Sequence, residues 1–185
     1  MVQVRRAADR ETGGELVNEL QQTFLKAAAP AAMASQAATG VPASITIAQA
    51  ILESGWGQSG LAKKANNFFG IKAAAHVAPD SYIQLPTEEI VLGKTVTEQA
   101  DFARYASMTD SFKAHGLLLM QAARYAPAMA VRAYPRAFAN ALQRCGYSTN
   151  PNYAGELMHI VNQLDLTQYD TQANTQPAAP AEEKA

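Results

Sequence analysis

The sequence predicts an α+β domain that is mainly helical, with one β-hairpin inserted in its middle. Three observations lead to this prediction. Alanine, the best helix former, makes up about a fifth of the residues. Apolar residues recur at helical spacing in both halves of the chain. Between Tyr82 and Tyr105 the composition changes to strand-forming residues around a glycine.

The composition allows a sizeable core and excludes several classes of partner. Hydrophobic residues make up 48% of the 185 residues and charged residues 17%, which is typical of a folded chain. Fifteen Lys and Arg against sixteen Asp and Glu leave a net charge of −1, so no global charge favours nucleic acid or an anionic membrane. No run approaches the ~18 apolar residues of a membrane span, and no signal-peptide core is visible. We therefore expect no nucleic-acid partner, no membrane insertion and a monomer.

The first helix is predicted after an aperiodic stretch, residues 1–10, which we interpret as a loose leader. Thr12 and Glu15 have the spacing of a capping box, which starts an amphipathic helix. Pro30 should break or kink this helix, because proline lacks the backbone N–H that a helix interior needs. Gly40 is expected to mark its end.

The second helix is predicted to begin at Pro42 and to stop at Gly55. Its apolar stripe includes Ile47 and Ile51, which lie one turn apart on the same face. Residues 57–81 carry turn and loop signals and are expected to hold no long element.

The β-hairpin is predicted between Tyr82 and Tyr105, with Gly93 between its two strands. Helices then resume. Thr109 or Asp110 is the expected cap of the first of them.

The last two helices are predicted from proline and asparagine positions. Pro135 opens one of them, and Asn150 caps the other, with Pro151 at its first position. We place the folded domain at residues 11–166. Residues 167–185 are polar, rich in Pro and Ala, and expected to form a disordered tail.

Glu53 is the candidate general acid. It falls in the last turn of the second predicted helix, where the negative end of the helix dipole disfavours an ionised carboxyl group. Leu52 and Trp56 could remove water from it as well. Both effects raise a carboxyl pKa, as a general acid working near neutrality requires. The residues alone also allow a solvated glutamate beside a turn.

Other catalytic patterns find no support in the spacing. His76, His115 and His159 are scattered and lack the spacing of a metal site. The single cysteine, Cys145, allows neither an internal disulfide nor a cysteine zinc site, and we expect it to be a buried thiol. The run at 57–61 is no nucleophile elbow, because leucine occupies its last position. We therefore expect no cofactor and no metal.

Four motifs, in order, carry a resemblance to a known family. The stretch AQAILESGWGQSGLAKKANNFFGIK (48–72) resembles the signature of bacterial peptidoglycan endo-β-N-acetylglucosaminidases, glycoside hydrolase family seventy-three. This family includes the enzymatic domain of the flagellar rod-cap protein, many autolysins and phage lysins. The other motifs are TEEIVLG (87–93), FARYASMTDSF (102–112) and CGYSTNPNYA (145–154). The resemblance covers residues 15–166.

The resemblance implies a lysozyme-like helical domain with an inserted β-hairpin lobe. It also implies hydrolysis of the β-1,4 bond between N-acetylglucosamine and N-acetylmuramic acid in peptidoglycan glycan strands. The family's catalytic acid corresponds to Glu53 and its active-site tyrosine to Tyr147. Gly93 aligns Glu89 with the hairpin glutamate of the family, which would assist as base or stabiliser. Glu88 lies one residue away and should face the opposite side of the strand.

The hairpin also departs from the family pattern. Ile90 stands where Tyr is usual and Leu92 where Asn is usual, which leaves the substrate contacts of the hairpin open. The N-acetyl carbonyl of the substrate could replace the second carboxylate as nucleophile, a known exception among glycosidases. Both routes remain open from sequence.

The candidate substrate contacts are four residues of these motifs. Trp56 offers a flat apolar face that could stack on a sugar ring, and Tyr105 lies in the third motif. Asn67 and Phe69 are also candidates, although their residue types favour a structural role, with Asn67 holding the loop and Phe69 anchoring it.

Two other functions stay open. One is a lytic transglycosylase or muramidase on the same fold, and the other is a non-catalytic wall-binding or assembly module. The resemblance places the activity at the cell wall, in a periplasmic, extracellular or phage-delivered protein.

Overall fold

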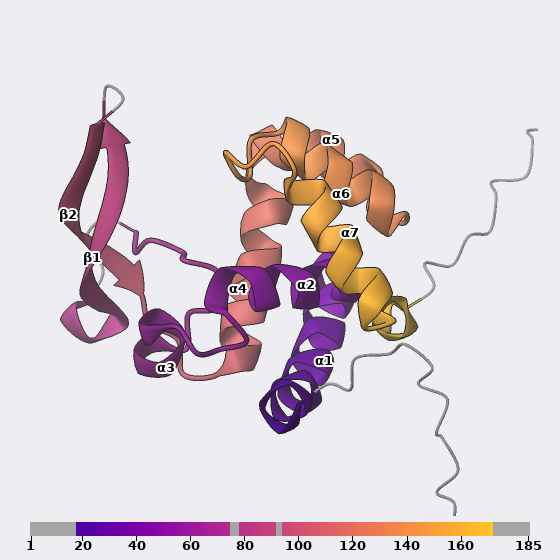
Figure 1. Cartoon of the computed structure of the whole chain (residues 1–185), viewed down its shortest axis with the longest axis horizontal. Coiled ribbons are helices and arrows are strands. Elements are labelled where there is room, and N and C mark those ends of the chain that lie inside the picture. The colour runs from indigo at the N-terminus through magenta and orange to yellow at the C-terminus, as the bar shows by residue number, and fades with distance from the viewer. Residues whose placement is uncertain (1–17, 75–77, 92–93, 172–185) are drawn as a thin grey trace, which may run out of the picture.

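The computed structural model describes residues 18–74, 78–91 and 94–171. This part of the chain forms a bundle of helices with a two-stranded antiparallel sheet at one side (Figure 1), which confirms the predicted class. In the described residues, no helix has the length and apolar character needed to cross a membrane. With η for short 3₁₀ helices, the elements are α1 (Glu19–Thr39), α2 (Ala43–Ser54), α3 (Gly60–Ala65), η1 (Pro79–Ser81), β1 (Tyr82–Val91), β2 (Lys94–Ala103), α4 (Met108–Gln121), η2 (Ala123–Tyr125), α5 (Ala126–Ala130), α6 (Pro135–Arg144), α7 (Tyr153–Gln163) and η3 (Leu166–Tyr169).

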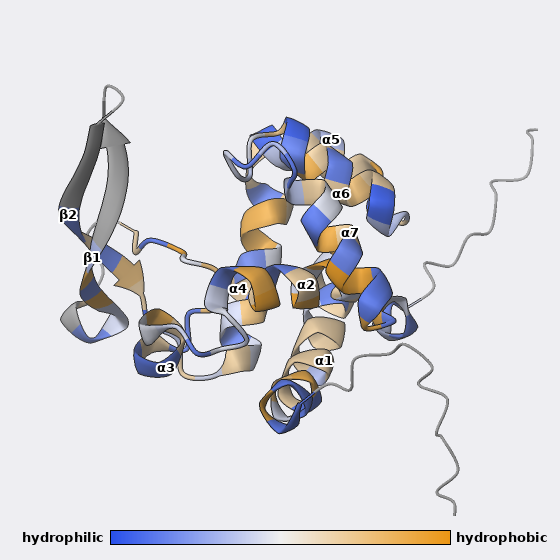
Figure 2. Cartoon of the chain, viewed as in Figure 1, coloured by the Kyte–Doolittle hydropathy of each residue, from blue (hydrophilic) through white to orange (hydrophobic). Residues whose placement is uncertain are grey.

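Helix α2 lies at the centre of the bundle. Ten of its twelve residues are buried, on every face of the helix. It packs against α1, α6, α7 and η3, and Figure 2 shows apolar residues on the helices around it. The stripe of Ile47 and Ile51 expected from sequence is therefore only part of the buried surface, because a helix covered on all sides has no solvent face.

Helix α1 begins with a capping box at Asn18. The Gln21 backbone N–H donates to Asn18 Oδ1 at 2.9 Å, and the Asn18 backbone N–H donates to Gln21 Oε1 at 3.0 Å. Each bond satisfies a donor that a helix start otherwise leaves unpaired. Thr12 and Glu15, which we expected to form such a box, lie outside the described residues.

Pro30 does not break α1, so the break that we allowed for at this position does not occur. The helix continues to Thr39 and ends, as predicted, at Gly40 with a left-handed φ of 77°. Small residues around the proline are buried, and α1 packs closely on α4. A Cβ on Gly116 of α4 would lie 2.6 Å from Ser35 Oγ. This tight interface holds α1 helical despite the hydrogen bond that Pro30 removes.

The β-hairpin is confirmed, with β1 and β2 paired from Tyr82 opposite Ala103 to Val91 opposite Lys94. Gly93, the expected turn, lies outside the described residues. The described residues of the stretch 57–81 hold no long element, as expected, but they include the short helix α3. Six residues are too few to show a helical period in a sequence.

Two later helix starts differ from the prediction. Helix α4 is capped by Ser107, which accepts a bond from the Asp110 N–H at 3.1 Å, and not by Thr109 or Asp110. Helix α7 begins at Tyr153, two residues later than expected. Asn150 instead accepts the backbone N–H two residues ahead at 2.9 Å, which is a turn of its own. The start of α6 at Pro135 is confirmed.

The fold continues beyond the predicted boundary at residue 166. Residues 166–169 form η3, with Leu166 fully buried. Asp170 then accepts two hydrogen bonds at the first turn of α2, from the Ser44 N–H at 2.8 Å and from Ser44 Oγ at 2.7 Å. A disordered tail from residue 167 is therefore wrong for 167–170. The leader and the rest of the tail lie outside the described residues.

We predict that Asp170→Ala destabilises the domain by about 1–2 kcal/mol, because α2 loses its carboxylate cap. Urea denaturation followed by circular dichroism measures this free energy. Asp80→Ala, which removes an exposed carboxylate on η1, is the matched control and should change it by less than about 0.5 kcal/mol. Equal stability of the two variants would contradict the cap.

Candidate active site

The last turn of α2 brings Glu53 to the surface beside Trp56. The helix ends at Gly55, whose φ of 56° is left-handed. Ser54 Oγ then accepts the Gly57 N–H at 2.8 Å, which closes the turn. Trp56 itself has a φ of 59°, a conformation that bulky residues rarely adopt. The turn thus carries both Glu53 and Trp56 at the end of a buried helix, with Glu53 bonded to Tyr153 of α7 and Trp56 packed on Phe24 of α1.

Tyr153 of α7 connects Glu53 to the core. Its hydroxyl donates to Glu53 Oε1 at 3.4 Å and accepts from Gln49 Nε2 at 2.9 Å. Gln49 is fully buried and Tyr153 is 2% exposed. Because the Gln49 amide donates to the phenol oxygen, the hydrogen of Tyr153 is left for Glu53.

The surroundings of Glu53 favour its protonated form. The residue as a whole is exposed, as one that meets a substrate must be. The neighbours around its carboxyl group nevertheless remove enough water to raise its pKa, and the bond from Tyr153 opposes this effect only in part. This agrees with the raised pKa predicted from sequence, with desolvation as the main cause.

Tyr147 lies on the other side of Tyr153. Their rings stack at 5.4 Å between centroids with an interplanar angle of 21°. The Tyr147 hydroxyl lies 3.1 Å from His115 Nε2. Burial, the negative charges that Tyr153 and Glu53 can carry, and a hydrogen bond with Tyr153 hold the pKa of Tyr147 well above its usual range. Tyr147 therefore remains a protonated phenol.

His115 of α4 is a buried neighbour that the sequence analysis did not include in the site. It is 1% exposed, and its ring stacks on Phe69 at 4.0 Å between centroids. Burial lowers its pKa to about 3, so the imidazole is neutral near pH 7. Gln49 was missed as well. Gln49 could have been found as a polar residue one turn before Glu53 in an otherwise apolar helix. His115 could have been found by its position one turn after Ser111 and Phe112 of the third motif.

A family model described as glucosaminidase, mannosyl-glycoprotein endo-beta-N-acetylglucosaminidase, matches residues 29–166. The chain belongs to this glucosaminidase family. Family membership makes the domain a glycoside hydrolase domain, and the expected resemblance is confirmed.

Named relatives support the same family. Exo-glucosaminidase LytG of Bacillus subtilis is 41% identical over 132 residues, which cover 69% of this chain and 45% of LytG. Peptidoglycan hydrolase FlgJ of Pseudomonas aeruginosa is 35% identical over 158 residues, which cover 83% of this chain and 39% of FlgJ. The chain thus spans less than half the length of these two relatives.

A solved structure confirms the family fold. The catalytic domain of the autolysin Auto from Listeria monocytogenes superposes with a TM-score of 0.73 at 31% identity, covering 83% of this chain and 89% of that domain. The expectation of a lysozyme-like helical domain with an inserted hairpin is confirmed by this likeness.

Two predicted substrate contacts of the glucosaminidase domain lie below the surface. Asn67 is 1% exposed, and its amide donates to the carbonyl oxygens of Ile71 at 2.8 Å and Ala103 at 2.9 Å. Phe69 is buried beneath His115. These contacts favour the structural role for both, so we correct their assignment: Asn67 ties the loop to β2, and Phe69 anchors it.

The other two predicted contacts stay available. Trp56 is half-buried, meets Phe24 edge to face at 5.9 Å, and lines an open apolar cavity of 580 Å³ with Phe68. Tyr105 is half-buried, and its backbone carbonyl accepts the side-chain amide of Asn66 at 3.1 Å. Both remain candidate substrate contacts of the glucosaminidase domain.

The second predicted carboxylate, Glu89, lies on β1 of the hairpin. Glu89 pairs with Val96 across the hairpin and Glu88 with Thr97. The side chains of both lie outside the described part of the chain, so the role of Glu89 stays a prediction. Neighbouring residues on a strand face opposite sides, and only one of the two can point toward a given substrate.

Candidate metal ligands do not gather in the described ranges, where no group of three or more His, Cys, Asp or Glu lies together. Cys145 ends α6 and is half-buried at the edge of the core, less enclosed than the buried thiol expected from sequence. His76 lies outside the described ranges.

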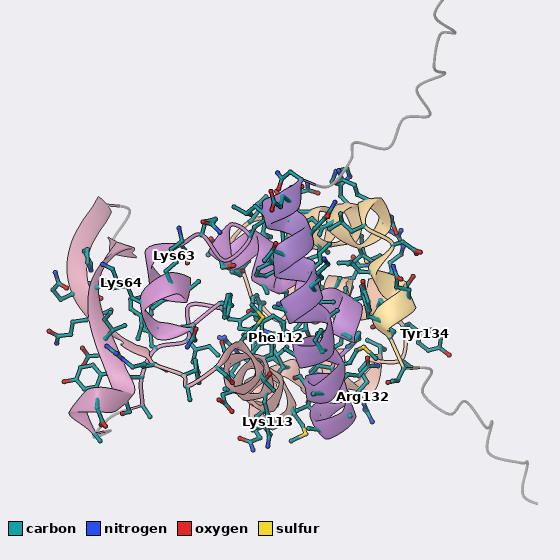
Figure 3. The ribbon with its side chains drawn as sticks, turned by 90° about the horizontal axis from the view of Figure 1, so that it is seen from below. Lys63, Lys64, Phe112, Lys113, Arg132 and Tyr134 are labelled. Atoms are coloured by element: carbon teal, nitrogen blue, oxygen red, sulfur yellow. The ribbon has the colours of Figure 1, made fainter. Side chains whose placement is uncertain are left out.

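We predict that Tyr153→Phe raises the pKa of Glu53 further, because it removes the hydrogen bond that favours the carboxylate. A carbon-13 NMR titration of the Glu53 carboxyl group measures this directly. Tyr134→Phe is the matched control, since Tyr134 is 65% exposed and lies at the edge of the molecule in Figure 3. A lower pKa in Tyr153→Phe, or an equal change in the control, would refute the assigned bond.

Proposed function

We propose that this domain is a peptidoglycan hydrolase that cleaves the β-1,4 bond between N-acetylglucosamine and N-acetylmuramic acid as an endo-β-N-acetylglucosaminidase. The observation that carries the proposal is Glu53. The residue is exposed, and its carboxyl group has a raised pKa and is hydrogen-bonded by a buried tyrosine. A carboxyl group in this state can donate a proton to a leaving oxygen near neutral pH.

In the proposed reaction, Glu53 protonates the glycosidic oxygen as the bond to the sugar breaks. The carboxylate that remains accepts the hydrogen bond from Tyr153, which stabilises the new charge. Trp56 offers an apolar face for a sugar ring. Tyr147, held protonated, can hydrogen-bond the N-acetyl group or orient a water molecule.

The second half of the reaction needs a group that stabilises or attacks the anomeric carbon. In the two-carboxylate route this group is Glu89, which stabilises the charge or activates water as a base. In the substrate-assisted route it is the N-acetyl carbonyl oxygen of the substrate. The two routes differ in whether removing Glu89 abolishes turnover.

The substrate class rests on the relatives. Peptidoglycan hydrolase FlgJ and exo-glucosaminidase LytG are more specific guides than the mannosyl-glycoprotein in the family description, because each is a single named protein that aligns with this chain at 35% and 41% identity. An autolysin of Enterococcus faecalis is 35% identical over 136 residues. We therefore infer that the domain acts on glycan strands at the cell wall, in a periplasmic, extracellular or phage-delivered protein.

A second candidate is exo-cleavage from the end of a glycan strand. The name of LytG, 41% identical to this chain, favours it. An endo-enzyme releases long fragments early in a digestion, whereas an exo-enzyme releases only the terminal unit. The size of the first products separates the two modes.

We predict that Glu53→Gln lowers the cleavage rate of purified peptidoglycan by at least about 100-fold, because the amide cannot donate the proton. Products are reduced and analysed by mass spectrometry, with reduced N-acetylglucosamine ends expected for the wild-type protein. Glu98→Gln, on an exposed position of β2, is the matched control and should remain active. Muramic or anhydro-muramic ends would instead place the domain with muramidases or transglycosylases. Binding without cleavage by the wild type would indicate a non-catalytic module.

We predict that Glu89→Gln lowers the same rate by about 100-fold or more, whereas Glu88→Gln leaves it within about threefold of wild type. The two residues are adjacent on β1 and carry the same charge, so each is a control for the other. Full activity in both variants would exclude the two-carboxylate route through this hairpin and support attack by the N-acetyl group.

A further inference from the structure

We propose that His115 is a positioning residue that donates to the Tyr147 hydroxyl and so directs the hydrogen of Tyr147 toward Tyr153, the residue that donates to Glu53. Tyr147 would then act on Glu53 through Tyr153. The part of this inference that concerns catalysis rests on the proposed function, since it takes Glu53 to be the general acid. The part that concerns the direction of the hydrogen bond rests on the structure alone.

The geometry around His115 leaves its imidazole one strong polar neighbour. Nε2 lies 3.1 Å from the Tyr147 hydroxyl oxygen. The ring is stacked on Phe69, with an interplanar angle of 13°, and meets the Tyr147 ring edge to face at 6.0 Å. The other nitrogen, Nδ1, is buried and has no hydrogen-bond partner among the described residues.

The unpaired nitrogen decides which tautomer is present. Burial keeps the ring neutral, so it carries a single N–H. If that hydrogen were on Nδ1, a buried donor would have no acceptor, which native proteins rarely allow. If it is on Nε2, the atom left unpaired is a lone pair on Nδ1, which is tolerated more often. His115 therefore donates from Nε2 to Tyr147, and the hydrogen of Tyr147 must point elsewhere.

Tyr153 shows the same arrangement one ring away. Gln49 Nε2 donates to its hydroxyl, and the unpaired buried atom of Gln49 is again an acceptor, Oε1. The freed hydrogen of Tyr153 goes to Glu53. The two stacked phenols thus each accept from a buried donor. Tyr147 is also hydrogen-bonded to Tyr153, so its hydrogen is directed to Tyr153, and that of Tyr153 to Glu53.

The first test is nitrogen-15 NMR of the His115 ring in the wild-type protein. We expect the Nε2–H tautomer, with no change between pH 5 and about 8 because the ring stays neutral. Observation of the Nδ1–H tautomer, or of a charged ring in this range, would overturn the assigned direction. This result does not depend on any enzymatic activity.

The second test is a double-mutant cycle in the peptidoglycan assay. His115→Phe keeps a flat ring on Phe69 but removes the donor, and we expect the rate to fall about tenfold, the value of one hydrogen bond. In the Tyr147→Phe background the same change should have little further effect. His115→Gln, which can present an N–H near the position of Nε2, should recover most of the loss. Thermal melting of each variant shows whether it is folded.

Three outcomes would overturn the positioning role. One is an equal loss of cleavage rate from His115→Phe in the wild-type and Tyr147→Phe backgrounds, which would mean that His115 acts through packing. Another is no rescue by His115→Gln in a folded variant. The last is full activity of Tyr147→Phe, which would show that Tyr147 has no role in catalysis. The NMR measurement would still test the hydrogen bond between His115 and Tyr147 on its own.

Discussion

The burial of α2 on all sides is the constraint on which the rest of the structure depends. Because neighbouring helices cover its whole length, the helix can reach solvent only where it ends, at Gly55. Glu53 lies in that final turn, with Gln49 one turn earlier in the core. The surface carboxylate and its buried support are therefore held by one rigid element, and Asp170 holds the opposite end of the same helix.

The buried polar side chains in this core lower the stability of the fold, and the packing of the helices does not need them. Gln49 and His115 are both buried, and each leaves one atom without a hydrogen bond in the described part of the chain. An unpaired buried polar group costs about 1–3 kcal/mol. Apolar residues of the same shape would avoid this cost, and both polar residues face tyrosines beside Glu53. Such costs are characteristic of sites kept for function rather than for stability.

Local signals predicted the ends of elements well where backbone geometry is decisive. Gly40 and Gly55 end helices because glycine adopts left-handed φ without strain. The capping residue of a helix was harder to predict. Ser107 and Thr109 are both able to cap α4, and which of them does so depends on where the helix begins to pack on its neighbours. The sequence did not show that α1 would continue past Pro30, because the interface of α1 with α4 joins residues far apart in the chain.

The sequence by itself determined the mainly helical class, the hairpin and the place of Glu53 at a helix end, because these follow from composition and spacing within one segment. It also determined the family, through four motifs in order along the chain. Only the tertiary structure decided the partners of Glu53. Tyr153 is 100 residues away from it, and His115 is 32 residues from Tyr147. It also decided that Asn67 and Phe69 are buried. Spacing fixes which face of a helix a residue occupies, whereas the contact of two faces depends on how separate helices pack together.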